Sequence, residues 1–140
     1  NFAKQGADLQ ASTISQMEVS KFMDMYDLDA HVDKIKAVYV KRRDVMLKTM
    51  EEEFPEGLVF THPEGGLFTW VELPSNLNAK ELMPKCLDKN VAYVAGGGFF
   101  PNGGRENTFR LNYSNMPEEK IIEGIKNIAA VLKEAMGVEA

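Results

Sequence analysis

Apolar residues recur with helical spacing in two parts of the chain. In residues 33–54, five apolar positions fall on one face of a helix, and Pro55 ends the run. Those positions are Ile35, Val38, Tyr39, Met46 and Met50. A second helix opens at Pro117, has acidic residues in its first turn and closes at Gly137. The stripe predicted for it consists of Ile121, Ile122, Ile125, Ile128, Ala129, Leu132 and Met136.

The middle of the chain has shorter apolar runs that predict strands. Residues 58–61 and 67–73 flank a segment with Pro and Gly, 62–66, which is typical of a hairpin. Residues 91–95 and 108–113 have the β-branched and aromatic content of two further strands. We therefore expect four short strands between the two helices.

Two more helical segments complete the pattern. Asn78 predicts a helix N-cap, with Glu81 three residues later as its capping-box partner. The buried face predicted for that helix consists of Leu82, Met83, Cys86 and Leu87. Residues 7–30 are polar with scattered apolar positions, which favours one helix or two that need another surface to pack on. The order α, α, β, β, α, β, β, α predicts an α+β domain, with helices on one face of a small, mostly antiparallel sheet.

Composition narrows the classes of function. The chain of 140 residues is 44% hydrophobic and 26% charged, which suits a single core. A net charge of −5 argues against a protein that binds nucleic acid through its phosphates. The lone Cys86 excludes an intrachain disulfide and favours a reducing compartment, and no apolar run is long enough to span a membrane. Because the sequence begins with Asn1 rather than Met, we expect a piece of a longer protein.

Arg110 is the first candidate site residue. In the strand 108–113, Phe109, Leu111 and Tyr113 point to one face, so Arg110 projects from the other. A guanidinium in that position suits a carboxylate, which it binds through charge-assisted hydrogen bonds worth about 1.5–3 kcal/mol each. A structural salt bridge or a solvated surface arginine accounts for the same pattern.

The loop 96–104 is the second candidate. Five of its nine residues are glycine, a composition that lets backbone approach a ligand closely. It lacks the lysine of a phosphate-binding loop, and a long mobile turn has the same composition. Phe99 and Phe100 nevertheless form an aromatic pair that favours contact with a surface. His31 and His62 lack metal-ligand spacing, so we expect no metal site, and the sequence holds no complete catalytic set.

Three ordered motifs resemble one family. They are Glu64-Gly65-Gly66-Leu67-Phe68-Thr69-Trp70, then Val91-Ala92-Tyr93-Val94-Ala95-Gly96 with Phe99, then Asn107-Thr108-Phe109-Arg110-Leu111-Asn112-Tyr113-Ser114. Together they resemble the C-terminal part of class I/II aminotransferases, fold-type-I enzymes that use pyridoxal 5′-phosphate. The resemblance is greatest to the branch of 2-aminoadipate and broad-specificity transaminases. It implies that Arg110 binds the α-carboxylate of amino-acid and 2-oxo-acid substrates, and that Gly66, Gly96 and Phe99 line the substrate pocket.

The resemblance also implies how the chain and the chemistry are divided. Residues 1–30 would be a connecting helical segment from a missing large domain, and residues 31–140 the C-terminal small domain. The Schiff-base lysine and phosphate cup of the family match no motif here, so we expect the fragment to hold no catalytic or cofactor-binding residue and to be inactive alone. The full-length enzyme should be a cytoplasmic homodimer. Ala95-Gly96 stands where the family usually has Pro-Gly, a departure that bears on substrate preference.

Two alternatives stay open beside this interpretation. One is a free-standing α+β module that uses Arg110 to bind amino acids. The other is the C-terminal part of a transaminase-like transcriptional regulator. What the gene encodes before Asn1 discriminates among the three.

Overall fold

The computed structural model describes residues 2–7 and 10–138, which fall into two compact units, Asn1–Ala37 and Val38–Ala140. The first unit holds α1 (Phe2–Ala7), α2 (Thr13–Met25) and the start of α3 (Leu28–Glu53). The segment predicted as one helix or two, 7–30, thus contains a separate α2, while its residues 8 and 9 lie outside the described part. None of the residues of α2 is buried.

α3 begins at Leu28 rather than at residue 33. Asp27 Oδ1 accepts a hydrogen bond from the Ala30 N–H at 3.0 Å, so Asp27 satisfies a free donor of the first turn. The helix predicted from residue 33 thus starts five residues earlier.

The second unit is built on a four-stranded sheet with the order β1-β2-β4-β3, in which all neighbours are antiparallel. The strands are β1 (Val59–Phe60), β2 (Phe68–Glu72), β3 (Val94–Ala95) and β4 (Thr108–Asn112). β1 and β2 form the predicted hairpin. β3 is shorter than the predicted strand 91–95, because the Val91 N–H donates to the Cys86 carbonyl at 3.0 Å and belongs to the turn after a helix.

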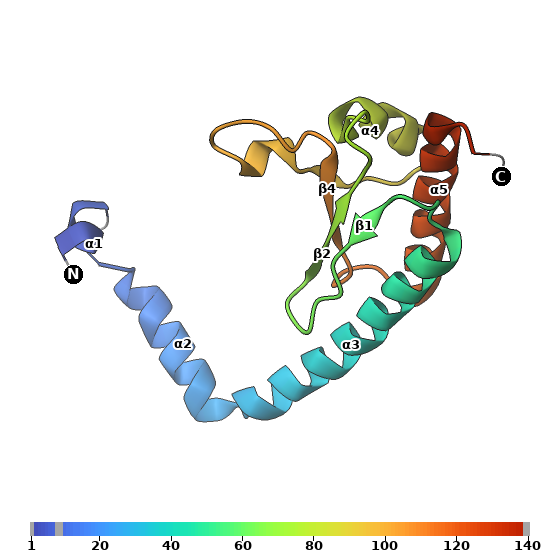
Figure 1. The fold of residues 1–140 in the computed structure, drawn as a ribbon. Helices are drawn as coiled ribbons and strands as arrows, with labels where there is room; N and C mark the ends of the chain where they lie inside the picture. Colours follow the sequence, from blue (N-terminus) through green and yellow to red (C-terminus); the bar gives the residue numbers. More distant parts are fainter. Residues whose placement is uncertain (1, 8–9, 139–140) are drawn as a thin grey trace. The chain divides into compact units, whose positions relative to one another are not determined.

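Helices lie on one side of this sheet, as predicted for an α+β domain (Figure 1). They are the second part of α3, α4 (Ala79–Asp88) and α5 (Glu118–Met136). The core between them includes Met50 from α3, Phe109 and Val71 from the sheet, and Ile125 and Leu132 from α5. Each of these side chains is at most 2% exposed, so the packing fixes the sheet firmly against the helices.

The helix ends follow the sequence pattern closely. Asn78 caps α4, and its side-chain oxygen accepts a hydrogen bond from the Lys80 N–H at 2.9 Å. Gly137 ends α5 in the left-handed region, with φ of 69°, where glycine avoids the steric cost of a Cβ. The predicted N-cap of α4 and the predicted C-terminal end of α5 are therefore confirmed.

Three residues predicted to be buried are exposed instead: Val38, Leu87 and Ile122. Each directly adjoins a residue that does pack, and successive residues are rotated by about 100° around a helix. Their neighbours Tyr39, Cys86 and Ile121 occupy the packed stripe. The stripe predicted for α5 also omits Val131, which is fully buried.

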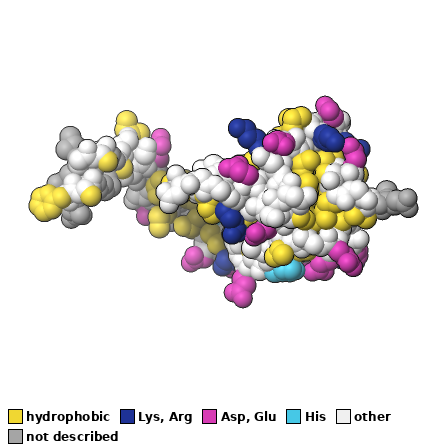
Figure 2. All heavy atoms as spheres, turned by 45° about the horizontal axis from the view of Figure 1, so that its top comes forward, with side chains coloured by type: hydrophobic (Ala, Val, Ile, Leu, Met, Phe, Trp, Pro, Cys, Tyr) yellow, Lys and Arg dark blue, Asp and Glu magenta, His cyan; other side chains and the backbone are white. Residues whose placement is uncertain are grey.

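The surface carries charges of both signs. On the face shown in Figure 2, acidic and basic side chains are interspersed. Within residues 2–7 and 10–138, no helix is both long and apolar enough to cross a membrane.

Candidate functional site

The face of the sheet opposite the helices carries the candidate site. On β2, Thr69 and Val71 are buried, whereas Phe68, Trp70 and Glu72 alternate with them and stay partly or largely accessible. β4 pairs with β2 so that Arg110 lies directly opposite Trp70. The strand alternation thus places Arg110 on the open face, as the sequence predicts.

Two aromatic rings flank the Arg110 guanidinium. Its Cζ lies 3.9 Å from the ring centroid of Phe68 and 4.9 Å from that of Phe99. Both distances are within the range of a cation–π contact, in which the negative face of the ring attracts the cation. Rings over the faces of a planar guanidinium leave its N–H edge as the route for an acceptor.

Arg110 has no acidic partner among the side chains that the structure describes. No salt bridge found there includes it, and its Nε is buried without a hydrogen-bond partner. A buried donor left without a partner costs about 1–3 kcal/mol, so such a group invites a ligand. A structural salt bridge, the alternative considered from sequence, therefore lacks a partner in the described part of the chain.

Phe99 reaches Arg110 from the glycine-rich loop. It ends a short 3₁₀ turn, η1 (Gly97–Phe99), that follows β3. Trp70 contacts both loop aromatics edge-on, with ring centroids 5.7 Å from Phe99 and 6.1 Å from Phe100. The loop thus lies over the open face through its aromatic pair, in agreement with the preference of such a pair for a surface.

Gly96 owes its identity to packing against β4. Its N–H donates to the Thr108 carbonyl at 2.7 Å, which continues the pairing of β3 and β4. A Cβ at Gly96 would lie 2.0 Å from Thr108 Oγ1 and 2.9 Å from the Thr108 carbonyl oxygen. The close approach of two backbones therefore accounts for a glycine here without a ligand.

Gly66 shapes the turn that precedes Phe68. Its φ of 85° is in the left-handed region, which glycine adopts without strain. The turn is tied to the domain by the Tyr113 hydroxyl, which donates to the Gly65 carbonyl at 3.3 Å. Arg43 Nη1 donates to the Pro63 carbonyl at 3.3 Å. None of these contacts brings Gly66 to the Arg110 guanidinium.

Sequence reasoning missed most of the residues that surround Arg110. Phe68 and Trp70 were regarded as hairpin residues, and Glu72 and Arg105 were not singled out. The signal was present in β2, where Phe68, Trp70 and Glu72 share one face by strand alternation. Arg105 gave no such signal, because its partner Glu72 lies in a strand remote in sequence.

The described residues do not fit the covalent anchor of a pyridoxal cofactor. A lysine that forms a Schiff base is activated by a lowered pKa, which requires a desolvated position or a cationic neighbour. Among the lysines from Lys21 to Lys133, no side chain is buried. The pKa of Lys120 is shifted the opposite way, upward, by its hydrogen bond with Glu123.

The remaining titratable candidates belong to the core. Cys86 is fully buried, as predicted, and burial raises the pKa of its thiol, which keeps it in the unreactive form. Burial likewise raises the pKa of Tyr93, whose hydroxyl donates to the Ala79 carbonyl at 2.6 Å. No cluster of His, Cys, Asp and Glu suited to a metal ion occurs in the part of the chain that the structure describes.

Comparison with known proteins identifies relatives of the whole domain. Residues 3–128 match the family model described as aminotransferase class I and II. The aromatic-amino-acid aminotransferase 1 of Thermococcus litoralis is 46% identical over 134 residues, which cover 96% of this chain and 32% of that protein. The chain therefore spans about a third of the length of the curated relative that it matches.

Solved structures have the same fold. The α-aminoadipate aminotransferase of Thermus thermophilus, complexed with N-(5′-phosphopyridoxyl)-L-leucine, is 38% identical with a TM-score of 0.86. The match covers 96% of this chain and 34% of that one. The multiple substrate aminotransferase of Thermococcus profundus is 43% identical, with a TM-score of 0.88 over 97% of this chain and 34% of that one. The family resemblance and the predicted fold class are both confirmed.

Proposed function

Because this chain belongs to the class I and II aminotransferase family, we propose that the full-length protein transfers an amino group between an amino acid and a 2-oxo acid. Within it, Arg110 binds the α-carboxylate of the substrate. The observation that carries this role is a guanidinium flanked by Phe68 and Phe99, whose buried Nε has no hydrogen-bond partner and which has no acidic partner among the described residues.

A carboxylate fits that edge through two parallel N–H···O bonds. Both of its oxygens accept, and the shared plane of the two groups fixes the direction in which the rest of the substrate extends. The nearby rings of Phe68 and Phe99 shield the guanidinium from part of the solvent, which strengthens its charge-assisted bonds. Arg110 therefore binds and orients the substrate.

Phe99 is the second substrate contact that we propose, because it adjoins Arg110 and is half exposed. Gly66 and Gly96 contribute to the pocket through backbone shape. Gly66 turns the chain before Phe68, and Gly96 starts the loop that carries Phe99. Neither glycine needs to touch the substrate for its replacement to move one of the rings.

The rest of the full-length protein completes the site. We propose that it holds pyridoxal 5′-phosphate, the cofactor that the family implies, and that two chains form a cytoplasmic homodimer. Residues 1–30 then connect the large domain to the small domain of residues 31–140. The piece described here should be inactive alone, because no described lysine is placed to anchor the cofactor.

The test is the Arg110→Ala variant of the full-length protein. The KM for the amino-acid donor should rise by at least about a hundredfold, since two charge-assisted hydrogen bonds of about 1.5–3 kcal/mol each are lost and each 1.4 kcal/mol is a factor of ten. The KM of Arg110→Lys should lie between that of Arg110→Ala and that of the wild type, because lysine keeps the charge but not the planar fork. Cofactor content, read from the visible absorption spectrum, should not change. An unchanged KM in Arg110→Ala contradicts the carboxylate role.

The same spectrum tests the proposed activity as a whole. A visible band that shifts when a mixture of amino acids is added supports the aminotransferase. A full-length product without such a band supports the binding module. A cofactor-binding product that carries a winged helix and turns over no amino acid supports the regulator.

A further inference from the structure

We propose that Glu72 and Arg105 form a latch that holds the loop 96–104 on the sheet, so that Phe99 stays against Arg110. This inference rests on the proposed carboxylate role of Arg110. It assigns Glu72 and Arg105 as positioning residues, which act on the substrate through the loop.

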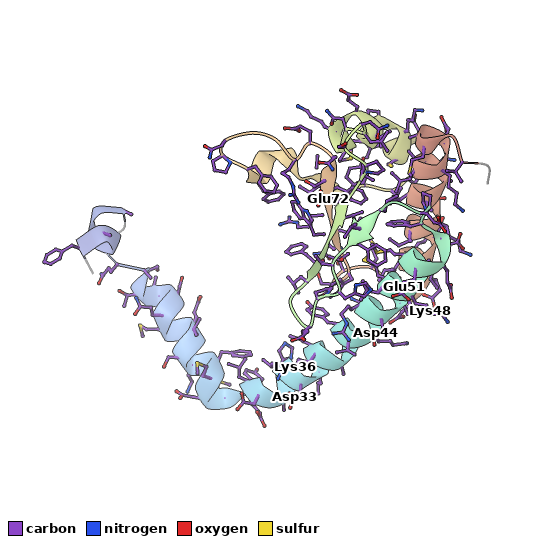
Figure 3. The ribbon with its side chains drawn as sticks, viewed as in Figure 1. Asp33, Lys36, Asp44, Lys48, Glu51 and Glu72 are labelled. Carbon is purple, nitrogen blue, oxygen red and sulfur yellow. The ribbon has the colours of Figure 1, made fainter. Side chains whose placement is uncertain are left out.

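The latch joins the far end of the loop to β2. Arg105 Nη2 lies 2.8 Å from Glu72 Oε2, within the range of a charge-assisted hydrogen bond. Figure 3 labels Glu72, the last residue of β2. Trp70 and Glu72 are two residues apart in β2, so they point to the same open face as Arg110.

Arg105 also contacts one ring of the loop, Phe100. Its Cζ lies 5.7 Å from the ring centroid of Phe100, so one guanidinium contacts both the sheet and the loop. Phe100 adjoins Phe99, and both rings contact Trp70 edge-on. A continuous series of contacts thus runs from Glu72 through Arg105 and the two loop rings to Arg110.

The backbone of the loop gives a reason why a latch is needed. Gly103, Gly104 and Arg105 are consecutive residues in the left-handed region, with φ of 71°, 85° and 61°. Glycines lower the barrier to other loop conformations, and a left-handed arginine is unfavourable without a compensating contact. Phe99 is 48% exposed, so the sheet alone does not hold it. The Glu72–Arg105 pair supplies the missing constraint.

Release of the loop has a defined consequence for Arg110. Without Phe99, one face of the guanidinium opens to water, and the side chain gains rotamers that do not present its edge to the substrate. Substrate binding then weakens, while later steps that do not involve the carboxylate are unaffected. The signature of the latch is therefore a rise in KM with an almost unchanged kcat.

The experiment compares Glu72→Gln and Arg105→Asn in the full-length protein. Glu72→Gln removes the ion pair with little change in size, and Arg105→Asn removes it with a shorter side chain that tolerates the left-handed backbone at position 105. We expect each variant to raise the KM for the amino-acid donor about two- to fivefold, the range for a partly exposed ion pair. Arg105→Lys keeps the charge but not the planar contact with Phe100, so its KM should lie between that of Arg105→Asn and that of the wild type.

The matched control is Glu134→Gln. It breaks a similar ion pair, Lys85 Nζ to Glu134 Oε1 at 2.7 Å, which joins α4 to α5 away from the open face. This variant should leave both kcat and KM unchanged. A rise in KM with Glu134→Gln equal to that with Glu72→Gln overturns the proposal, because general loosening of the domain would then explain both.

The Arg110→Ala background separates the latch from the carboxylate role. If Glu72 acts mainly through Arg110, Glu72→Gln raises KM less in that background than in the wild type. A full two- to fivefold rise there overturns the latch. If Arg110→Ala raises KM but Glu72→Gln does not, the latch is wrong and the carboxylate role stands. If Arg110→Ala leaves KM unchanged, the proposed function fails, and the latch with it.

Discussion

The two faces of the sheet are built from the same two strands but are held by different forces. On the helix side, Val71 and Phe109 lie among apolar side chains and are fully buried. On the open side, Phe68 and Arg110 lie against each other and remain partly accessible. One face contributes stability through the area removed from water, and the other holds a charge in a defined orientation. Substitutions on the first face should therefore change folding, and those on the second should change substrate binding.

The largest expected effect is on the buried face. Phe109→Ala removes a ring that stacks on Tyr93 with centroids 4.4 Å apart, and should lower the free energy of unfolding by about 3–5 kcal/mol. Urea unfolding of the full-length protein measures this change. Phe68→Ala, on the opposite face of the neighbouring strand, is the matched control and should cost much less. Equal losses for the two variants would remove the distinction between the faces.

The next effect is at the entrance to the loop. Gly96→Ala places a methyl group 2.0 Å from Thr108 Oγ1 and should lower the free energy of unfolding by about 1–3 kcal/mol. Gly98→Ala, two residues later, meets no atom within 4 Å and should change it by less than about 0.5 kcal/mol. Comparison of the two variants separates the effect of the close backbone approach at Gly96 from the effect of loop flexibility. A similar loss of unfolding free energy in both would mean that loop flexibility, and not the close approach, causes it.

A smaller effect is expected for Phe68→Leu on the open face. The substitution keeps an apolar side chain on β2 but removes the ring that contacts Arg110, a contact worth about 0.5–1 kcal/mol. We expect a two- to fivefold rise in KM, by the usual conversion of about 1.4 kcal/mol per tenfold, with the unfolding midpoint nearly constant. Steady-state kinetics and urea unfolding on the same preparation test this. A lower unfolding midpoint with an unchanged KM would mean that Phe68 contributes to core packing and not to substrate binding.

The smallest effect concerns the pH dependence of stability. Burial raises the pKa of Cys86 above the usual 9.0, so the unfolded chain loses this proton first as pH rises. The corresponding stability is fully present well below pH 9.0 and declines as the pH rises through 9.0, with about 0.4 kcal/mol lost at pH 9.0 itself. Cys86→Ala should unfold more readily overall but show a shallower decline between pH 8 and 10. If stability declined identically in Cys86→Ala and the wild type, the pH dependence would come from other groups.

The sequence predicts the helix-covered face much better than the open one. The spacing of Ile121, Ile125 and Ile128 defines one side of α5, and the alternation around Arg110 defines the two faces of β4. Both patterns are local, because side-chain direction follows from helix and strand geometry. The errors at Val38, Leu87 and Ile122 come from the width of a helical stripe, which depends on the surface that packs against it.

The surroundings of Arg110 could not be predicted in the same way. Phe68, Phe99 and Arg105 come from β2 and a loop, and their contacts depend on a strand register and a backbone path that no local pattern encodes. The predicted roles of Gly66, Gly96 and Phe99 rested on family resemblance. The structure adds a packing reason for Gly96 and a turn for Gly66, and it brings only Phe99 to Arg110.

The position of the Arg110 guanidinium between two rings has a consequence for selectivity among anions. A side chain already confined between two rings loses little conformational entropy when a ligand arrives, so more of the hydrogen-bond energy appears as affinity. The guanidinium is flat and presents its donors in one plane. Planar groups with two oxygens can use both donors at once, whereas the oxygens of a tetrahedral sulfonate or phosphonate extend out of that plane toward Phe68 and Phe99. The amino-sulfonate analogue of a substrate should therefore bind more weakly than the carboxylate of the same charge.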